Sequence, residues 1–218
     1  MLRQILADCQ PLPWCTGQMN SIYFSTSFTS SAERLDQCPD AVVEVAFAGR
    51  SNAGKSSAIN TITRNGKLAR TSKTPGRTQL INHFEVEDQR FLVDLPGYGY
   101  AQVSKAKQKA WQASMLRYLS RREALRGLVI VMDIRRPLQD SDWSMIELQQ
   151  ESHAELHLLL TKADKLSRSA QNQSVLDVQK QMRDAGISAT IQDFSALKGT
   201  GLDDMHKVLD HWLYDREL

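Results

Sequence analysis

The fold is decided by one stretch, Val45-Ala46-Phe47-Ala48-Gly49-Arg50-Ser51-Asn52-Ala53-Gly54-Lys55-Ser56. An apolar run ends at a glycine, and after four further residues Gly-Lys-Ser completes the pattern G-x-x-x-x-G-K-[ST]. Beyond it, Ile59 and Ile62 lie at helical spacing. Strand, glycine-rich turn and helix in this order predict a loop whose backbone N–H groups bind phosphate at a helix N-terminus. A turn that contains Lys-Ser by chance is the alternative, and the flanking elements argue against it.

Each part of this loop has an expected task. Gly49 and Gly54 let the backbone turn tightly and approach phosphate closely. Lys55 is expected to reach the β- and γ-phosphates of a nucleoside triphosphate, and the Ser56 hydroxyl to ligate Mg²⁺. The residues of this loop expected to bind the nucleotide are Gly49, Arg50, Ser51, Asn52, Ala53, Gly54, Lys55 and Ser56.

Length and composition fit one domain with a sizeable core, since the chain has 218 residues and 41% of them are hydrophobic. Its longest apolar runs are far shorter than the roughly 20 residues that span a bilayer, so no membrane segment is expected. Residues 1–18 lack the apolar core of a signal peptide, and we predict a disordered extension there and a single domain over 19–218. All 3 cysteines precede the glycine-rich loop without a metal-binding pattern, which is typical of cytoplasmic proteins.

Strand signals alternate with helix signals along most of the chain. Strands are predicted over 43–48, 80–86, 90–93, 128–132, 156–160 and 190–194, and helices over 55–64, 104–122, 140–152, 171–184 and 202–213. The expected fold is therefore an α/β three-layer sandwich of the P-loop NTPase type. Its central sheet should be mostly parallel with one antiparallel strand, and helices should cover both faces.

The remaining segments carry weaker signals. Alternating apolar residues predict an edge strand over 21–28, and a short helix or loop should follow over 32–39. Residues 65–78 are rich in Thr, Ser and Gly with few apolar anchors, so we expect a mobile loop there. The short connection 87–89 predicts an antiparallel hairpin between its two strands.

A second motif follows the strand predicted over 90–93. The residues expected to contact the nucleotide there are Asp94, Leu95, Pro96 and Gly97. Because ligands bind at the carboxyl ends of parallel strands, Asp94 is expected to hold Mg²⁺, and the Gly97 N–H to bond the γ-phosphate. Many turns fit D-x-x-G, but its place 39 residues after Lys55 strengthens the assignment.

Two further loops follow the strands predicted over 156–160 and 190–194. Their expected nucleotide contacts are Thr161, Lys162, Ala163 and Asp164 in the first and Phe194, Ser195 and Ala196 in the second. The Asp164 carboxylate would accept from the guanine N1–H and exocyclic amine, which favours GTP over ATP because adenine has no N1–H. The Ala196 N–H would donate to guanine O6, and Ser195 would brace the loop of Asp164. Thr161 stands where N-K-x-D motifs carry Asn, and the alternative is a surface Lys-Ala-Asp turn.

These motifs, with Lys73-Thr74-Pro75-Gly76-Arg77-Thr78 and Gly97-Tyr98-Gly99-Tyr100-Ala101, resemble the EngB-type GTPases of the TrmE-Era-EngA-EngB-septin-like superfamily. The resemblance covers about residues 40–214 and implies a GTP-hydrolysing switch needed for assembly of the large (50S) ribosomal subunit, and thereby for cell division and septation. It marks Thr78 as the Mg²⁺ ligand of the mobile loop, whereas chemically Thr71, Ser72 and Thr74 fit as well. The nucleotide contacts expected from this loop are Gly76, Arg77, Thr78, Gln79 and Leu80.

The metal ligands expected are Ser56, Thr78 and Asp94, and the catalytic residues Lys55, Asn52 and Gly97. Where Ras-type enzymes carry a glutamine after D-x-x-G, this chain has Tyr98, so slow intrinsic hydrolysis is expected. Asn52 could hold K⁺ against the phosphates, as it does in relatives with Asn at this position, or merely satisfy the loop backbone. Arg77 could act as an arginine finger, although a solvated or RNA-bound arginine suits its loop better.

Basic residues suggest the partner. From Val45 to Phe84 there are 7 Lys or Arg and no acid. A basic face is expected from Arg64, Lys67, Arg70, Lys73, Lys105, Lys107, Lys109, Arg117, Arg121, Arg122 and Arg126. Such a face would attract RNA phosphate of the large subunit in a salt-dependent manner, and an ordinary solvated helix is the alternative. We expect a cytoplasmic monomer with GTP or GDP bound and no membrane partner.

Three other functions compete with this interpretation. The first is a GTPase of the same superfamily that acts in tRNA modification, another RNA process or membrane-linked signalling. The second is a P-loop ATPase or kinase, against which Asp164 argues. The third is a GTPase-like protein that only binds RNA, which the intact Lys55, Ser56 and Asp94 make improbable.

Overall fold

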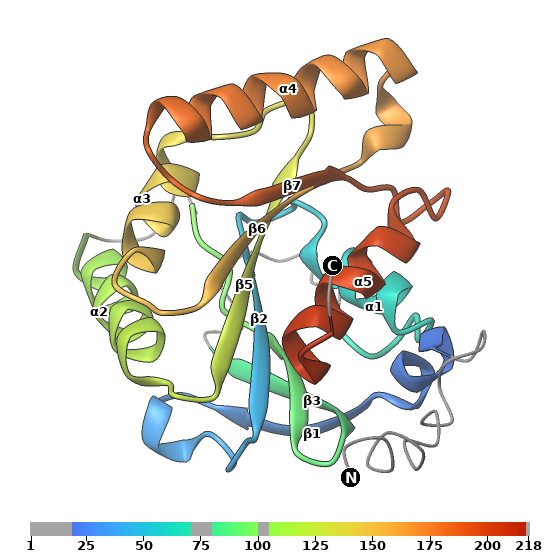
Figure 1. Ribbon diagram of the computed structural model, residues 1–218. Coiled ribbons are helices and arrows are strands. Elements are labelled where there is room, and N and C mark those ends of the chain that lie inside the picture. The colour runs from blue at the N-terminus through green and yellow to red at the C-terminus, as the bar shows by residue number, and fades with distance from the viewer. Residues whose placement is uncertain (1–18, 71–79, 100–104, 217–218) are drawn as a thin grey trace, which may run out of the picture.

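The computed structural model describes residues 19–70, 80–99 and 105–216. Within them, 7 strands form one sheet in the order β1-β3-β4-β2-β5-β6-β7 (Figure 1). The strands are β1 (Ser27–Ala32), β2 (Val43–Gly49), β3 (Ile81–Glu87), β4 (Arg90–Asp94), β5 (Leu125–Asp133), β6 (Glu155–Thr161) and β7 (Thr190–Asp193). Of these described strands, only β3 runs antiparallel to its neighbours β1 and β4, and the pairs from β4 to β7 are parallel.

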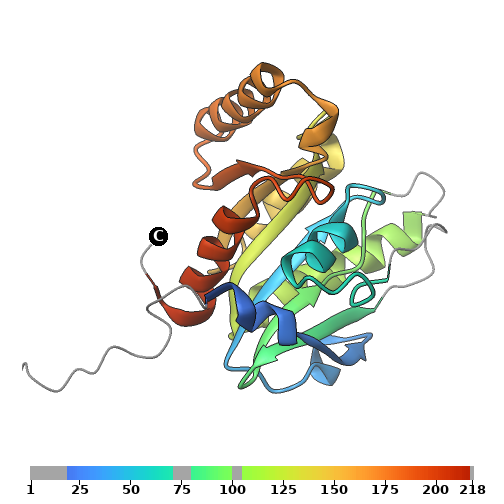
Figure 2. The same ribbon diagram turned by 90° about the vertical axis from the view of Figure 1, so that its right-hand side faces the viewer.

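Helices cover both faces of this sheet. They are α1 (Lys55–Ile62), α2 (Lys105–Arg121), α3 (Asp140–Gln149), α4 (Arg168–Asp184) and α5 (Leu202–Tyr214). One buried apolar cluster joins the sheet to α2, α3 and α4, and a second joins it to α1 and α5. Figures 1 and 2 show the sheet between these two groups. The predicted three-layer sandwich, with one antiparallel strand, is confirmed.

The N-terminal prediction was wrong in detail. Instead of an edge strand over 21–28, the structure has a 3-10 helix at Met19–Ser25, and the edge strand β1 follows at Ser27–Ala32. The 3-10 helix packs on α5, because the Tyr23 ring stacks on His206 of that helix and the Tyr23 hydroxyl donates to the buried Asp210 carboxylate at 2.6 Å. The apolar residues that suggested a strand therefore belong mainly to a helix that packs on α5. The strand β1 itself has the sequence Ser-Phe-Thr-Ser-Ser-Ala and is mostly exposed.

The other elements agree with the sequence within a few residues, including a short 3-10 helix at Leu35–Gln37 in the segment expected to be helix or loop. Asp88 and Gln89 join β3 to β4 in the expected hairpin, and both have positive φ. No helix in the described residues is both long and apolar enough to cross a bilayer. The predicted extension 1–18 lies outside the described residues and stays a prediction.

The packing of α5 on the sheet depends on a close approach at Gly127. A Cβ built on Gly127 in β5 would lie 2.2 Å from a ring carbon of Trp212 in α5. The indole is rigid and buried, so it has little room to move. We expect Gly127→Ala to lower the free energy of unfolding by about 1–3 kcal/mol, measured by urea denaturation.

Gly66→Ala is the matched control, because a Cβ there would meet no atom within 4 Å. We expect that substitution to change the free energy of unfolding by less than about 0.5 kcal/mol. Equal losses in the two variants would contradict the packing argument.

Candidate functional site

The glycine-rich loop connects the carboxyl end of β2 to the first turn of α1. Asn52 and Gly54 both have positive φ, at 63° and 105°. For Gly54, which precedes the first helical residue Lys55, this conformation suits glycine best. The loop therefore closes tightly, and the N-terminus of α1 begins at the predicted phosphate-binding lysine.

The D-x-x-G segment runs beside this loop because β4 is the parallel neighbour of β2. Asp94 is in register with Phe47. Beyond the strands, Tyr98 N–H donates to the Gly49 carbonyl at 3.3 Å, and Ser51 N–H donates to the Tyr98 carbonyl at 3.1 Å. These bonds continue the sheet past its regular end and hold Gly97 close to the glycine-rich loop.

Lys55 and Asp94 are in direct contact. The Lys55 ammonium bonds the Asp94 carboxylate and donates to the Leu95 carbonyl at 2.8 Å, and both side chains are largely buried. The Ser56 hydroxyl donates to the Arg70 carbonyl at 3.2 Å. Lys55, Ser56 and Asp94, three of the residues predicted to bind phosphate or metal, therefore gather at the N-terminus of α1.

Thr161 ties a third loop to the first. Its buried hydroxyl lies in hydrogen-bond contact with the Ala53 carbonyl of the glycine-rich loop and with the Met132 carbonyl at 2.9 Å. A hydroxyl has one proton for these two acceptors, whereas an Asn side chain would offer two N–H groups. Thr161, in place of the Asn of N-K-x-D motifs, therefore still links its segment to the glycine-rich loop, but it offers one hydrogen-bond donor where Asn would offer two.

Lys162 makes a second bridge to the same loop. Its ammonium donates to the Asn52 carbonyl at 2.6 Å and lies 3.0 Å from the Asp133 carboxylate. Asp133 ends β5 and also bonds the Arg135 guanidinium at 2.6 Å. Hydrogen bonds from Arg135, and then from Lys162, hold the pKa of Asp133 well below its usual value. A charged Asp133 therefore fixes the Lys162 side chain against the loop.

Asp164 meets the loop that follows β7, as the sequence predicted for Ser195. The Ser195 hydroxyl donates to the Asp164 carboxylate at 2.8 Å, and the Lys165 ammonium lies 3.0 Å from it. These contacts, the Ser195 bond first, lower the pKa of Asp164. Ala163 N–H donates to the Phe194 carbonyl at 3.1 Å, and Ala196 packs at the edge of the apolar cluster shared with α1 and α5. The two predicted guanine-side loops are thus joined.

Most of the nucleotide contacts predicted between residues 71 and 80 fall outside the described part of the chain. Gly76, Arg77, Thr78 and Gln79 lie outside the described residues, as do the alternative ligands Thr71, Ser72 and Thr74. Leu80, at the start of the described segment, is partly buried directly before β3.

The donors at the N-terminus of α1 fit a magnesium ion. Ser56 and Asp94 offer hard oxygen atoms, which Mg²⁺ prefers, and Mg²⁺ commonly takes one or two protein ligands together with nucleotide phosphates and water. Among the described residues, no group of 3 or more His, Cys, Asp or Glu side chains forms a metal centre of its own. The arrangement therefore suits a metal that arrives with its nucleotide.

Two supporting residues were missed by the sequence analysis. Asp133 follows a buried strand, which is the same signal that identified Asp94. Asn60 on α1 has no such signal: its side chain bonds Ala69 N–H at 2.7 Å and the carbonyls of Gly66 and Ala69, so it holds the chain after α1 against the helix.

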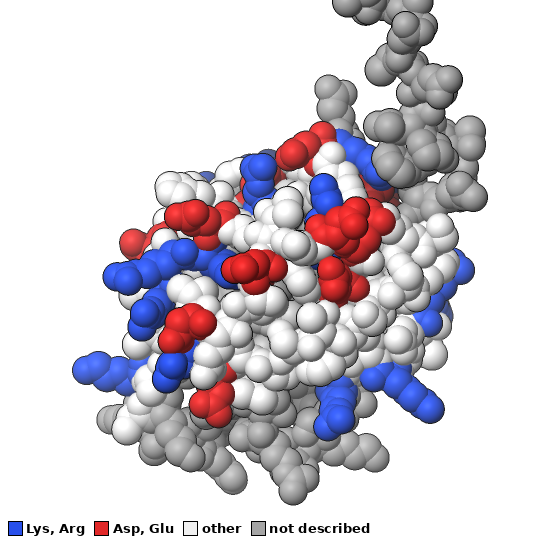
Figure 3. All heavy atoms as spheres, turned by 90° about the horizontal axis from the view of Figure 1, so that it is seen from below, with Lys and Arg blue, Asp and Glu red and all other residues white. Residues whose placement is uncertain are grey.

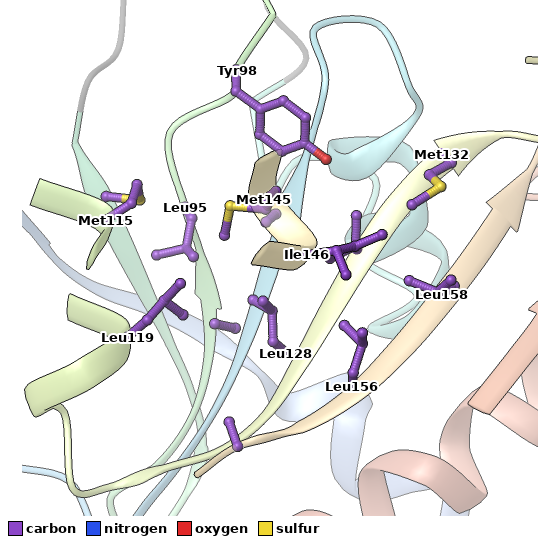
Figure 4. Packing of buried hydrophobic residues seen from close by; sticks show 14 of the residues in the cluster. Leu95, Tyr98, Met115, Leu119, Leu128, Met132, Met145, Ile146, Leu156 and Leu158 are labelled. Carbon is purple, nitrogen blue, oxygen red and sulfur yellow. The ribbon is translucent and has the colours of Figure 1, made fainter. Parts of the chain in front are cut away.

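Tyr98 is turned into the core. It belongs to the apolar cluster beneath α2 and α3, with Met115, Leu95 and Met145 (Figure 4), and its ring centroid lies 5.7 Å from that of Trp111. Its hydroxyl donates to the buried Asp142 carboxylate at 3.0 Å. The side chain that replaces the glutamine of Ras-type enzymes is therefore a packing residue in this structure.

The predicted basic face is smaller than expected. The prediction for Arg122 is wrong, because its guanidinium is buried against both carboxylate oxygens of Glu44 at 2.5 and 2.9 Å. Lys109, Arg117 and Arg121 are exposed on α2. Lys73 and the side chains of Lys105 and Lys107 lie outside what is described.

The other basic residues do not extend this surface directly. Arg64, Lys67 and Arg70 follow α1, on the opposite face of the sheet from α2, and the Arg64 guanidinium lies 4.3 Å from the Phe24 ring centroid. Arg126 lies 3.7 Å from Asp215. Figure 3 shows basic and acidic side chains interspersed on the described part of the lower face. Of the predicted basic residues that the structure describes, Lys109, Arg117 and Arg121 lie together on one exposed helix, so α2 is the part of the predicted basic face that can be tested.

Comparisons with known proteins agree with the geometry. The model of the family described as 50S ribosome-binding GTPase matches residues 44–162. The probable GTP-binding protein EngB of Aeromonas salmonicida is 52% identical over 186 residues, which cover 85% of this chain and 86% of that protein.

Solved structures share the fold. A crystal structure of a probable GTP-binding protein engB has a TM-score of 0.64 at 20% identity and covers 80% of this chain and 100% of its own. Era from Aquifex aeolicus, bound to GDP and AlF4⁻, has a TM-score of 0.59 at 18% identity over 82% of this chain and 59% of its own. With the sequence relative and the family model, these findings show that the chain belongs to the EngB family of GTP-binding proteins, which are GTPases.

Proposed function

We propose that this GTPase is a nucleotide-dependent switch that assists assembly of the large ribosomal subunit, and is thereby needed for cell division and septation. The nucleotide part rests on one observation: Lys55 bonds Asp94 beside the glycine-rich loop, and Lys162, two residues before Asp164, bonds the Asn52 carbonyl of the same loop, while Ser195 holds Asp164. The ribosomal part is supported by the family model, whose description is a 50S ribosome-binding GTPase.

Phosphate and guanine are recognised at opposite ends of the proposed site. Lys55 and the N–H groups at the start of α1 bind the phosphates. Asp164, kept ionised and oriented by Ser195, accepts from the two donors of guanine. Lys162 lies along the base and ribose, held by Asn52 and Asp133.

Magnesium would be held by Ser56, Thr78 and Asp94 together with the phosphates. When bound, it neutralises charge on the transferred phosphoryl group. Gly97 N–H donates to the γ-phosphate, so the segment after Asp94 distinguishes GTP from GDP. Because the Tyr98 side chain is buried, no glutamine-like group orients the attacking water from this position, and intrinsic hydrolysis is slow.

Asn52 is the candidate for a potassium site. It is exposed at the rim of the glycine-rich loop, and among the described residues no side-chain hydrogen bond engages it. The alternative, in which the Asn52 side chain satisfies the loop backbone, has no hydrogen bond to support it in the described residues, where only the Asn52 carbonyl is bonded, by Lys162. A K⁺ ion held there would add positive charge beside the phosphates, in the manner of an arginine finger.

Guanine specificity can be tested at Asp164. We expect Asp164→Asn to lower GTP affinity roughly 100-fold, since two charge-assisted hydrogen bonds are lost. Xanthosine triphosphate should then bind better than GTP, because its altered base edge matches the amide. Equilibrium titration with both nucleotides measures the preference.

Asp193→Asn is the control for this experiment, because Asp193 is a carboxylate at the end of β7 that pairs with Arg168. It should keep the preference for GTP. A variant at Asp164 that still prefers GTP would refute the assignment of the guanine site.

The potassium site predicts a dependence on the cation. We expect GTP hydrolysis by the wild type to be about 10- to 100-fold faster in KCl than in NaCl, in line with the effect of one added electrostatic donor. Asn52→Ala should remove the difference, whereas Asn65→Ala, outside the loop, should retain it. Equal wild-type rates in the two salts, with and without ribosomal subunits, would exclude this use of Asn52.

The ribosomal role predicts salt-dependent binding through α2. With GTP bound, the double variant Arg117→Ala and Arg121→Ala should cosediment less with large subunits, and its dependence of log affinity on log salt should be shallower by about 2. The control pair Lys180→Ala and Arg183→Ala removes two exposed charges from α4 and should bind like the wild type. Equal binding of the GTP and GDP forms would disprove the switch.

A further inference from the structure

Asp142 is a buried carboxylate outside every nucleotide-binding motif. It lies in the first turn of α3 and its side chain is 0% exposed. A carboxylate at such a position must be compensated by donors, since an unpaired buried charge is strongly destabilising. Two hydrogen bonds and one ion pair, from three separate segments of the chain, compensate the Asp142 carboxylate.

Two of these contacts, one hydrogen bond and the ion pair, come from the proposed nucleotide site. The Tyr98 hydroxyl, directly after Gly97, donates to one carboxylate oxygen at 3.0 Å. The other oxygen lies 3.3 Å from Nε of Arg50, directly after Gly49. One side chain of α3 therefore contacts both the D-x-x-G segment and the glycine-rich loop.

The backbone makes this contact tight. Arg50 and Tyr98 form a parallel bridge, and the Arg50 guanidinium also donates to the Arg136 carbonyl at 3.0 Å. A Cβ built on Gly99 would lie 3.1 Å from the Ser141 hydroxyl and 3.3 Å from Cγ of Arg50. The D-x-x-G segment is thus pressed between the glycine-rich loop and the start of α3.

A purely structural role explains only part of this geometry. The oxygen of Asp142 beside Arg50 also accepts from Gln139 N–H at 3.0 Å, which caps α3. Capping requires only the carboxylate oxygen that accepts from Gln139. The other carboxylate oxygen accepts from Tyr98, which belongs to a different segment of the chain. The cap therefore does not account for the contact with the nucleotide site.

We propose that Asp142 is a positioning residue for GTP hydrolysis, which locks the D-x-x-G segment onto the glycine-rich loop through Tyr98 and Arg50. The inference rests on the proposed nucleotide site. Gly97 lies between Asp94, fixed by Lys55, and Tyr98, fixed by Asp142. These contacts of Asp142 hold the Gly97 N–H in place for the γ-phosphate. Breaking them therefore weakens the bond to the γ-phosphate of GTP, which GDP lacks.

The chain contains a matched control for the Tyr98 contact. At the amino end of the same sheet, the Tyr118 hydroxyl donates to the buried Glu44 carboxylate at 2.8 Å, and Arg122 bonds that carboxylate as well. Tyr98→Phe and Tyr118→Phe each remove one buried hydroxyl from a tyrosine–carboxylate–arginine group. Only the first of these groups contacts the nucleotide site.

The experiment compares kcat, the affinities for GTP and GDP, and the melting temperature of these two variants. We expect Tyr98→Phe to lower kcat about 10- to 100-fold, as small misplacements of reacting groups do, and to lower affinity for GTP but not for GDP. Tyr118→Phe should lower the melting temperature by a similar amount while kcat and both affinities stay at wild-type values.

Asp142→Asn provides a second measurement. Combined with Tyr98→Phe, it should reduce kcat no further than Asp142→Asn alone, because both substitutions break one lock. Additive losses, or an equal loss of kcat in Tyr118→Phe, would overturn the inference and leave Asp142 a helix cap.

The Asp164→Asn experiment separates this inference from the proposed site. A shift toward xanthine nucleotides together with wild-type kinetics of Tyr98→Phe would overturn the lock and leave the site standing. Slower hydrolysis in Tyr98→Phe without a shift in Asp164→Asn would support the lock and count against the guanine assignment alone.

Discussion

The glycine-rich loop depends on donors from the carboxyl end of β6 and the residue that follows it. A phosphate-binding loop directs N–H groups at its ligand, so some of its carbonyl groups need partners from other segments. Thr161 supplies one at the Ala53 carbonyl, and Lys162 supplies another at the Asn52 carbonyl. The segment expected to read the base thereby also shapes the segment that binds phosphate, which makes the two halves of the site one unit.

Buried carboxylates paired with a tyrosine and an arginine recur around the sheet. Besides the groups centred on Asp142 and Glu44, Tyr23 and Arg216 contact Asp210 at 2.6 and 3.3 Å. Removing one partner of such a group leaves a charge poorly compensated, so each group ties distant segments together. The groups at Glu44 and Asp210 attach α2 and the N-terminal 3-10 helix to the body, whereas the group at Asp142 also reaches the nucleotide site.

The sequence predicted what local patterns encode. Asp94 and Asp164 were identified because each follows a strand within a short motif, and the alternation of strands and helices indicated the sandwich. The role of Asp142 was not predicted, because its partner Tyr98 is 44 residues away and no residue pattern in its own helix indicates the contact. Arg122 was misassigned for the same reason, since its partner Glu44 lies on another element. The edge strand was misplaced because packing on α5 can produce the apolar spacing of a strand.

The contact between Lys55 and Asp94 suggests why nucleotide and magnesium should bind together at the proposed site. The two side chains offset each other's charge in a largely buried position. Phosphate alone would draw Lys55 away and leave Asp94 without its partner, while a metal alone would leave the lysine uncompensated. In either case one charged side chain stays largely buried without a partner, which is energetically unfavourable. At the proposed site, a magnesium–nucleotide complex would supply an anion for Lys55 and a cation for Asp94 in one step, which would compensate both charges of the opened pair.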